Sequence, residues 1–424
     1  MRLNHTEITG LLIQLGLMLL AGRFFAEVAR KLRQPAVVGE ILAGILLGPT
    51  ILGMVSPDLF DMLFPVGRSS MVLDGFVQVA VVMLLFIAGL EVDLHIVLQQ
   101  GKQAFYTSIL GLGIPFAFGF FVPQLLPLAF EAANPNVRLA QALFMGISMA
   151  ITALPVIARV LMDLNLFKSR LGMLVISSAM ITDLIAWLIF SVILGMAGRE
   201  NSFSWYNTLL VTLGFTVLIL TIGRGLVNRS LPWVNRNLAW PGGVLALSLG
   251  LCFLASAFTE YIGIHAIFGA FLCGVVLGDS EHFSERAKEI VHQFINNVFA
   301  PLFFVAIGLK VNFILNFDLT VTLVILVIAF AGKVIGSGLG ARLGGFGWRE
   351  SLATGIGMNA RGAIEIILGL VALEYKLINE TVFVALVIMA LVTSMTSGPI
   401  MKLVLGTSYP ERAAPRIPVR EEER

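Results

Sequence analysis

The chain has 424 residues, of which 58% are hydrophobic and only 13% are charged, and its formal net charge is +2. Soluble domains carry about a quarter charged side chains, so this composition excludes a soluble globule and indicates a polytopic helical membrane protein. The apolar runs are continuous rather than alternating, which excludes an outer-membrane barrel. There is no basic tract interleaved with aromatic residues, so the expected partner is the lipid bilayer and no nucleic acid is expected.

An all-α integral membrane fold with 13 transmembrane helices is predicted from the spacing of proline, glycine and charge clusters. The predicted segments, in chain order, are 8–29, 36–53, 71–91, 103–128, 137–162, 171–197, 206–227, 240–260, 262–278, 290–310, 319–343, 349–374 and 380–404. Eighteen of the 28 basic residues fall in the odd-numbered loops and the C-terminal tail, and six fall on the other side. Basic residues accumulate on the cytoplasmic side, so we expect a multi-pass protein of the cell (inner) membrane with its N-terminus outside and its C-terminus in the cytoplasm.

The sequence also repeats itself in three places. Segment two reads GEILAGILLG from Gly39 and segment nine reads GAFLCGVVLG from Gly269, with identical glycine spacing. FIAGLEVDL (86–94) resembles FVAIGLKVNF (304–313), and GISMAITALP (146–155) resembles GIGMNARGAI (355–364). All three pairs keep their order and lie seven segments apart, so the second copy runs in the opposite direction through the membrane.

This pattern predicts two inverted six-helix repeats, a signature of secondary transporters. The transmembrane domain would span 1–404, with repeat one at about 8–197, a linker helix at about 206–227 and repeat two at about 240–404. A short cytoplasmic tail would follow at 405–424.

Asp183 lies at the middle of the sixth segment, roughly 18–20 Å from each end of a helix there. A carboxylate near the bilayer centre is costly unless it faces a polar cavity or a partner, so it is a functional candidate. A buried aspartate in a structural hydrogen-bond network is the alternative. Thr182 and Thr152 offer hydroxyl oxygens that suit a hard monovalent cation, although threonine in a membrane helix often bonds its own backbone.

Two segments are predicted to be interrupted near the midplane. Pro155 should break the fifth, with a half-helix starting at Pro155 and Thr152 as a nearby cap. The twelfth contains several glycines and Asn359, which is predicted to cap the second half-helix. Broken helices 5 and 12 at corresponding places of inverted halves indicate a binding site, whereas ordinary kinks for packing are the alternative.

Basic residues also lie inside spans. Lys333 and Arg361 are both central in their segments, and either could neutralise Asp183 when no ion is bound. Arg361 is also four residues before Glu365, a spacing that favours a structural ion pair on one helix face. For Lys333, a structural brace and a partner of the site are equally compatible with the sequence.

These features predict a secondary active transporter, and not an enzyme, because the sequence shows no catalytic motif and calls for no cofactor. A monovalent cation and a proton would compete for Asp183, so the transported Na⁺ or K⁺ is the metal expected there. Two rivals stay open. An ion channel would need an open polar pore, and an anion symporter would use half-helix N-termini and Arg361 to hold its substrate.

Five stretches together resemble the membrane domain of monovalent cation:proton antiporters. They are QPAVVGEILAGILLGPTILG (34–53), LLFIAGLEVDL (84–94), ITALPVIARVL (151–161), the Thr182-Asp183 pair and GMNARGAIEIILG (357–369). The similarity is to the branch that holds Kef-type potassium/proton exchangers, plant cation/proton exchangers and bacterial sodium/proton antiporters. This resemblance implies the sodium/proton antiporter fold, homodimers, elevator-type alternating access and a role in pH homeostasis. It also implies that Asp183 binds the ion and the proton and that Lys333 is the basic residue near the crossing.

The sequence departs from that family in two respects. Electrogenic members carry two adjacent acids and many electroneutral ones carry Asn-Asp, whereas this chain has Thr182 before Asp183. One titrating acid per cycle favours electroneutral exchange, although release of a proton from Lys333 would change the stoichiometry. Kef-like relatives often add a cytoplasmic nucleotide-binding domain, whereas this chain stops about twenty residues after its last predicted helix. Two interpretations are open: the protein is an unregulated transporter, or the sequence has been shortened.

Overall fold

The computed structural model describes residues 4–32, 34–65, 67–92, 101–130, 135–167, 169–197 and 205–406. All regular elements within these ranges are helical. They are α1 (His5–Lys31), α2 (Ala36–Leu47), α3 (Leu52–Val55), α4 (Pro57–Leu63), α5 (Arg68–Leu90), α7 (Gly101–Phe120), α8 (Val122–Leu125), η1 (Pro127–Ala129), α9 (Pro135–Ala150), α10 (Leu154–Asp163), α11 (Arg170–Ala197), α12 (Trp205–Leu218), η2 (Ile219–Gly223), α13 (Arg224–Asn237), α14 (Gly242–Tyr261), α15 (Ala266–Gly278), α16 (Glu285–Lys310), α17 (Leu319–Leu343), α18 (Trp348–Gly357), α19 (Ala363–Glu374) and α20 (Glu380–Leu405). The predicted tail lies outside the described residues from position 407 onward.

The all-helical membrane architecture expected from the composition is present. Within the described ranges, 11 helices or joined helix pairs are long and apolar enough to cross a membrane. The helix at the ninth predicted segment, α15, is shorter, and α18 and α19 divide the twelfth. The chain is therefore a multi-pass membrane protein, while the count of thirteen crossings stays a prediction.

The seventh predicted segment is longer than its apolar run. The helix continues through the π-helical turn η2 and ends only at Asn237, ten residues after the predicted end at 227. Its last part is amphipathic and buries Val227, Leu231 and Val234 while its polar side chains face outward. Hydropathy alone marks only the apolar part, because an amphipathic continuation is helical without being uniformly apolar.

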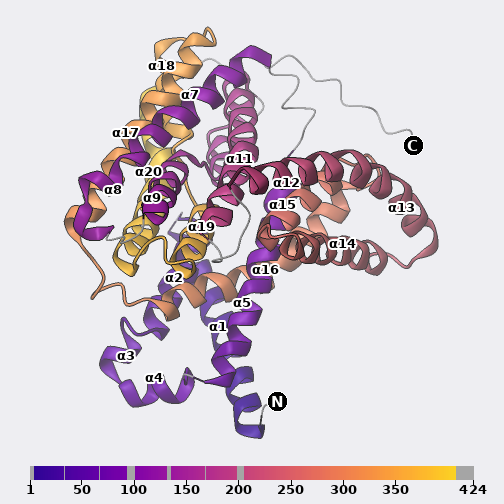
Figure 1. Ribbon diagram of the computed structural model, residues 1–424, viewed down its shortest axis with the longest axis vertical. Coiled ribbons are helices and arrows are strands. Elements are labelled where there is room, and N and C mark those ends of the chain that lie inside the picture. The colour runs from indigo at the N-terminus through magenta and orange to yellow at the C-terminus, as the bar shows by residue number, and fades with distance from the viewer. Residues whose placement is uncertain are drawn as a thin grey trace.

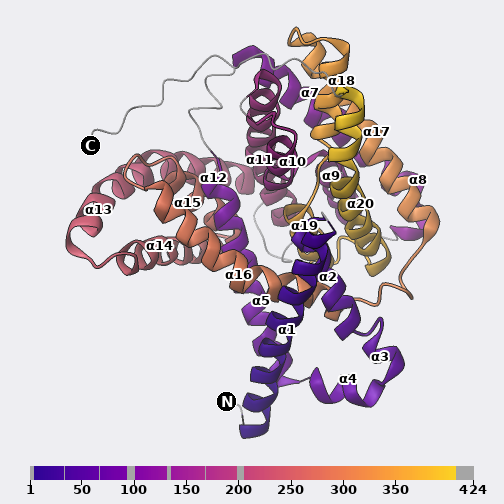
Figure 2. The ribbon, with the colours of Figure 1, turned by 180° about the vertical axis from the view of Figure 1, so that it is seen from behind.

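The helices form two groups. Figure 1 shows α7, α9, α17, α18 and α20 gathered on one side, and α12, α13, α14 and α15 on the other. The view from behind keeps this separation, with α1, α2, α5 and α16 between and below them (Figure 2). A second, smaller apolar core joins α10, the first half of α11 and α18.

The glycines of the repeated pattern sit where helices cross closely. A Cβ on Gly44 in α2 would lie 2.2 Å from the carbonyl oxygen of Val305 in α16. A Cβ on Gly274 in α15 would lie 2.2 Å from the carbonyl oxygen of Phe86 in α5. No side chain fits at such distances, so glycine is required where the two backbones meet.

The first glycine of each pattern is equivalent in the same way. Gly39 packs against the Phe25 carbonyl of α1, and Gly269 packs against the Ala255 carbonyl of α14. In each half, therefore, the second helix meets the first helix of its own half at the first glycine and a helix of the other half at the second. This equivalence supports the predicted repeat, whose boundaries stay a prediction.

Candidate ion-binding site

The fifth predicted segment is divided between α9 and α10. α9 ends at Ala150 and α10 begins at Leu154, with Pro155 in its first turn. Proline is accommodated there because the first turn of a helix has no intrahelical acceptor for its backbone N–H groups. Helix α10 thus starts one residue before the position predicted from Pro155.

The twelfth segment is divided between α18 and α19. α18 ends at Gly357 and α19 begins at Ala363, and Gly362 is the residue before the first turn. No side chain caps α19, so the prediction that Asn359 caps this half-helix is wrong. The amide of Asn359 is fully buried, and neither its nitrogen nor its oxygen has a hydrogen-bond partner among the residues that the structure describes.

The two interruptions, residues 151–153 and 358–362, contact each other, and we call this meeting point the crossing. The Thr152 hydroxyl donates to the Met358 carbonyl at 2.7 Å, and the Ala153 N–H donates to the Ala360 carbonyl at 2.8 Å. The prediction that Thr152 caps α10 is therefore wrong, because α10 has no side-chain cap. Its hydroxyl instead satisfies a carbonyl of the other interrupted segment, which is how two non-helical stretches avoid unpaired backbone groups inside a membrane.

Two buried cations bind the end of α9. The Lys333 ammonium from α17 donates to the Gly111 carbonyl of α7 at 3.0 Å and to the Ala150 carbonyl. The Arg361 guanidinium donates to the carbonyls of Ser148 and Met149. The last carbonyls of a helix carry partial negative charge and lack intrahelical donors, so both cations stabilise this half-helix terminus.

Arg361 also forms an ion pair with Glu365 at 2.7 Å, with both side chains almost fully buried. The predicted ion pair between Arg361 and Glu365 is thus confirmed. Contrary to the prediction, the two residues do not share one helix, because Arg361 lies in the interruption before α19. Ser394 of α20 donates to the Arg361 carbonyl, a contact that the sequence analysis missed. The only signal for it is a hydroxyl residue near the middle of the last segment.

Asp183 is almost fully buried in α11, and within the described ranges its Oδ1 atom has no hydrogen-bond partner. The preceding Thr182 hydroxyl donates to the Ser178 carbonyl of its own helix at 2.8 Å, the alternative noted for threonine in membrane helices. Lys333 and Glu91 are near enough to act electrostatically on Asp183. The Asp183 carboxylate therefore feels the charge of Lys333, which binds the end of α9, while its Oδ1 atom has no partner among the described residues.

The face of α11 that carries Asp183 is directed toward the other helix group. Trp187, one turn further along, packs against Phe271 of α15 with ring centroids 5.7 Å apart. Residues four apart share a helix face, so Asp183 looks toward the α5 and α15 pair, at whose end Glu91 lies. The carboxylate thus sits at the boundary between the two helix groups.

Charged side chains also connect helices at the ends of this boundary. Lys310 at the end of α16 pairs with Asp74 of α5 at 3.0 Å and with Glu374 of α19 at 3.3 Å. At the end of α5, Glu91 pairs with His292 of α16 at 3.0 Å. The pairs formed by Lys310 therefore connect α19, which starts at the crossing, to α5 and α16.

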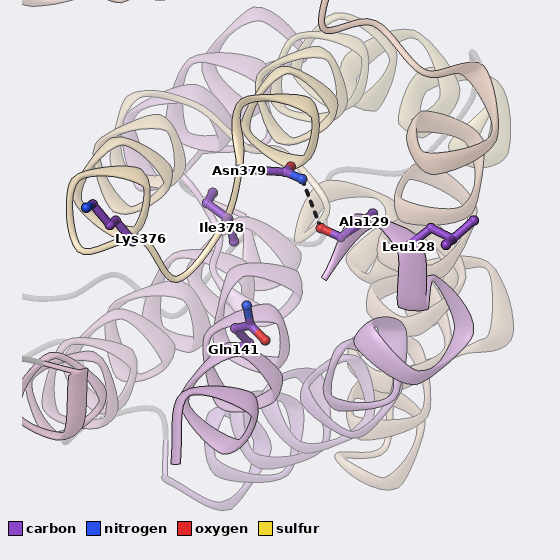
Figure 3. A pocket seen from close by; sticks show the side chains of 6 residues that line it. All are labelled: Leu128, Ala129, Gln141, Lys376, Ile378 and Asn379. Atoms are coloured by element: carbon purple, nitrogen blue, oxygen red, sulfur yellow. Dashed lines mark hydrogen bonds between the residues drawn. The ribbon is translucent and has the colours of Figure 1, made fainter. Parts of the chain in front are cut away.

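A separate pocket of about 330 Å³ lies near the ends of α8, α9 and α20. Figure 3 shows Gln141 of α9 on one side of it and Asn379 on the other, with the Asn379 amide donating to the Ala129 carbonyl at 3.1 Å. None of the eight predicted site residues lines it. The pocket is therefore distinct from the crossing.

Side chains in α11 and in the two interruptions carry oxygen atoms of several kinds. They include the Asp183 carboxylate, the Thr152 hydroxyl and the Asn359 amide, all of them buried. Within the described ranges there is no cluster of three or more His, Cys, Asp or Glu side chains of the kind that holds a transition metal. Hard monovalent cations prefer oxygen ligands of this kind.

The sequence of this chain matches a family model along most of its length. The model is described as "Sodium/hydrogen exchanger, transmembrane" and matches residues 16–406. The chain belongs to the sodium/hydrogen exchanger family. Members of this family are transporters rather than enzymes, in agreement with the expectation from the sequence.

Relatives of known name belong to the same family. The chain is 30% identical over 426 residues to K(+)/H(+) antiporter 1 of Saccharomyces cerevisiae, covering 96% of this chain and 47% of that protein. It is 31% identical over 397 residues to Na(+)/H(+) antiporter NhaS4 of Synechocystis, covering 93% of this chain and 96% of the relative. With Cation/H(+) antiporter 17 of Arabidopsis thaliana it is 32% identical over 406 residues. The chain spans about half the length of the yeast and Arabidopsis relatives.

The fold of this chain resembles that of a solved structure. The sodium proton antiporter MjNhaP1 from Methanocaldococcus jannaschii, solved at pH 8, superposes with a TM-score of 0.66 at 18% identity. The match covers 94% of this chain and 97% of that protein. This similarity supports the antiporter fold predicted from the motifs.

Proposed function

We propose that this chain exchanges a monovalent cation, sodium or potassium, for a proton across the membrane, with Asp183 as the group that both ions share. The observation that carries this proposal is the buried Asp183 carboxylate with an unpartnered oxygen. A carboxylate in such surroundings needs a neutralising partner. A bound proton and a bound cation are two alternative ways to supply it.

Competition at one carboxylate couples the two fluxes. With either ion bound, the Asp183 site is neutral and the helix group around the crossing can move, whereas a bare carboxylate at the boundary would hold it in place. Each half-cycle then carries one ion in one direction. Because one acid is shared, we propose an electroneutral exchange of one cation for one proton.

Lys333 and Arg361 fit a supporting role in this cycle. Both bind carbonyls at the end of α9, so they stabilise the crossing whether or not an ion is present. This arrangement also disfavours the anion symporter. Three N–H groups of Arg361 already bind Ser148, Met149 and Glu365, and the Glu365 carboxylate at 2.7 Å already supplies the anion that balances its charge.

The boundary between the helix groups suits an elevator-type movement. The group that contains the crossing would shift against α5, α15 and α16, and Asp183 would face one side of the membrane at a time. We propose a homodimer in the cell (inner) membrane, with the N-terminus outside and the C-terminus in the cytoplasm as the basic residues indicate. A dimer would give the stationary helices a fixed support.

The test is cation-driven proton flux in proteoliposomes, with sodium, potassium and lithium added in turn. Asp183→Asn should abolish the flux, because an amide takes up neither a proton nor a cation charge. The control is Asp163→Asn in α10, an exposed aspartate whose contact with Arg159 spans 3.9 Å, and we expect it to leave exchange unchanged. Robust exchange by Asp183→Asn would refute the assignment.

Two further measurements separate the mechanism from its rivals. Single-channel currents in a planar bilayer would identify a channel, since a carrier that moves once per ion gives none. A membrane-potential dye in the same proteoliposomes tests stoichiometry, and a one-for-one exchange should leave its signal flat. A potential that builds up during exchange would contradict electroneutrality.

A further inference from the structure

Asn359 is the most poorly satisfied neutral side chain at the crossing. Its amide is fully buried, and both Nδ2 and Oδ1 lack a hydrogen-bond partner in the part of the chain that the structure describes. The carbonyls on either side of it, those of Met358 and Ala360, are taken by Thr152 and Ala153. Burying an amide without a partner is unfavourable, so this position needs a ligand that the protein itself does not supply.

The repeat identifies the counterpart of Asn359 in the first half. Both interrupted segments contain the motif Gly-Ile-x-Met, and the residue that follows it is Ala150 in one and Asn359 in the other. Each lies where the first half-helix ends, since α9 ends at Ala150 and α18 ends at Gly357. The Ala150 carbonyl is bound by Lys333.

The counterpart of Lys333 follows from the packing of α7 against α17. Gly332 meets Pro115, and Gly340 meets Thr107. If Thr107 is the repeat counterpart of Gly332, and Pro115 that of Gly340, then each of these two contacts is the counterpart of the other. Both pairs of counterparts are separated by the same number of residues along the chain, as a repeat requires. The residue after Gly332 is Lys333, so its counterpart is the residue after Thr107.

That counterpart is Ser108, which carries no charge. Its hydroxyl donates to the Ala104 carbonyl at 2.7 Å and to the Ser178 carbonyl at 3.2 Å. In the described part of the chain, the end of α18 therefore receives the neutral Thr152 hydroxyl but no charged donor. The two half-helix termini are equivalent in position and unequal in charge.

This difference in charge makes the C-terminal end of α18 favourable for a cation. The end of α9 is neutralised by Lys333 and Arg361, whereas the end of α18 keeps the partial negative charge of a helix C-terminus. The unpartnered amide oxygen of Asn359 lies beside it. Lys333 acts electrostatically on Asp183 and bonds Ala150, two residues before Thr152, so all of these groups belong to one crossing.

We infer that Asn359 is a neutral oxygen ligand of the transported monovalent cation and that it sets the preference among alkali ions. The inference rests on the proposed exchange function. Asp183 supplies a charge that any monovalent cation can satisfy, so it discriminates little between them. Discrimination comes from the number and spacing of neutral oxygens, to which Asn359 and the α18 terminus contribute.

The experiment compares Asn359→Ala with the native chain in proteoliposomes, measuring the apparent KM for sodium, potassium and lithium. Loss of one oxygen ligand should raise the apparent KM for the preferred cation roughly tenfold and narrow the difference between cations, while the rate at saturating cation is largely kept. An unchanged KM and an unchanged order of cations would overturn the inference.

The control is Gln141→Ala in α9. Gln141 is also a buried amide with an unpartnered oxygen, but it lines the separate pocket of Figure 3. We expect it to leave the cation dependence unchanged, and an equal shift in both variants would refute a specific role for Asn359. If Asn359→Ala fails to fold, the nearly isosteric Asn359→Asp replaces it. A carboxylate there should lower the apparent KM, and an unaltered KM would refute the inference.

The outcome for Asn359 is distinguishable from the outcome for the function itself. If the native chain exchanges no cation for protons, the proposed function fails. If the native chain exchanges and Asp183→Asn does not, while Asn359→Ala behaves as the native chain, only the role of Asn359 fails.

Discussion

The buried pair of Arg361 and Glu365 allows a prediction in which a second substitution restores stability. Arg361→Ala removes the guanidinium that binds Glu365 and the carbonyls of Ser148 and Met149. A buried carboxylate left without its partner costs about 3–5 kcal/mol, and each unsatisfied carbonyl about 1–3 kcal/mol. We therefore expect the free energy of unfolding to fall by roughly 5 kcal/mol or more in Arg361→Ala.

Adding Glu365→Gln to Arg361→Ala removes the uncompensated charge but not the loss at the carbonyls. The double variant should be more stable than Arg361→Ala alone by about 3 kcal/mol. Glu365→Gln by itself leaves the Arg361 guanidinium buried without its counter-charge, so it should also cost about 3–5 kcal/mol, while the bonds of Arg361 to the end of α9 are kept. The native chain should thus be the most stable of the four and Arg361→Ala the least, with the double variant between them.

Unfolding in mixed micelles by titration with a denaturing detergent, followed by circular dichroism, measures all four proteins. The decisive quantity is the change in the free energy of unfolding when Glu365→Gln is added to Arg361→Ala. If Glu365→Gln lowers stability further in the Arg361→Ala background, or leaves it unchanged, Glu365 does not depend on Arg361 and the reasoning from the buried pair is wrong.

A further prediction follows from packing. A methyl group on Gly44 would collide with the α16 backbone, so Gly44→Ala should lower the free energy of unfolding by about 1–3 kcal/mol, measured by detergent unfolding. The control is Gly250→Ala in α14, where an added Cβ meets nothing within 4 Å, and this variant should keep native stability. Equal losses in the two variants would contradict the close approach of α2 and α16.

The two half-helix ends at the crossing differ in the charge of the side chains that bind them. One end is bound by two cations, Lys333 and Arg361, and the other is bound by a neutral hydroxyl from Thr152. Under our proposal for Asn359, the transported cation supplies the charge that the end of α18 lacks.

The sequence by itself determined the membrane-spanning character, the place of Asp183 at mid-span and the two interruptions. Each of these depends on local chemistry: continuous apolar runs, the missing N–H of Pro155 and the freedom of clustered glycines. The repeated glycine spacing also predicted equivalent crossings, since only glycine allows two backbones to approach as closely as at Gly44 and Gly274.

The tertiary structure alone decided what the polar side chains bind. Thr152 and Asn359 have the residue types of helix caps, yet the first bonds the opposite segment and the second bonds no group in the described part of the chain. Lys333 and Arg361 bind backbone carbonyls, which every residue possesses and which therefore leave no signature in the sequence. Such partners exist only once helices distant along the chain have crossed, and for that reason local preference predicted where the site lies but not how its charges are shared.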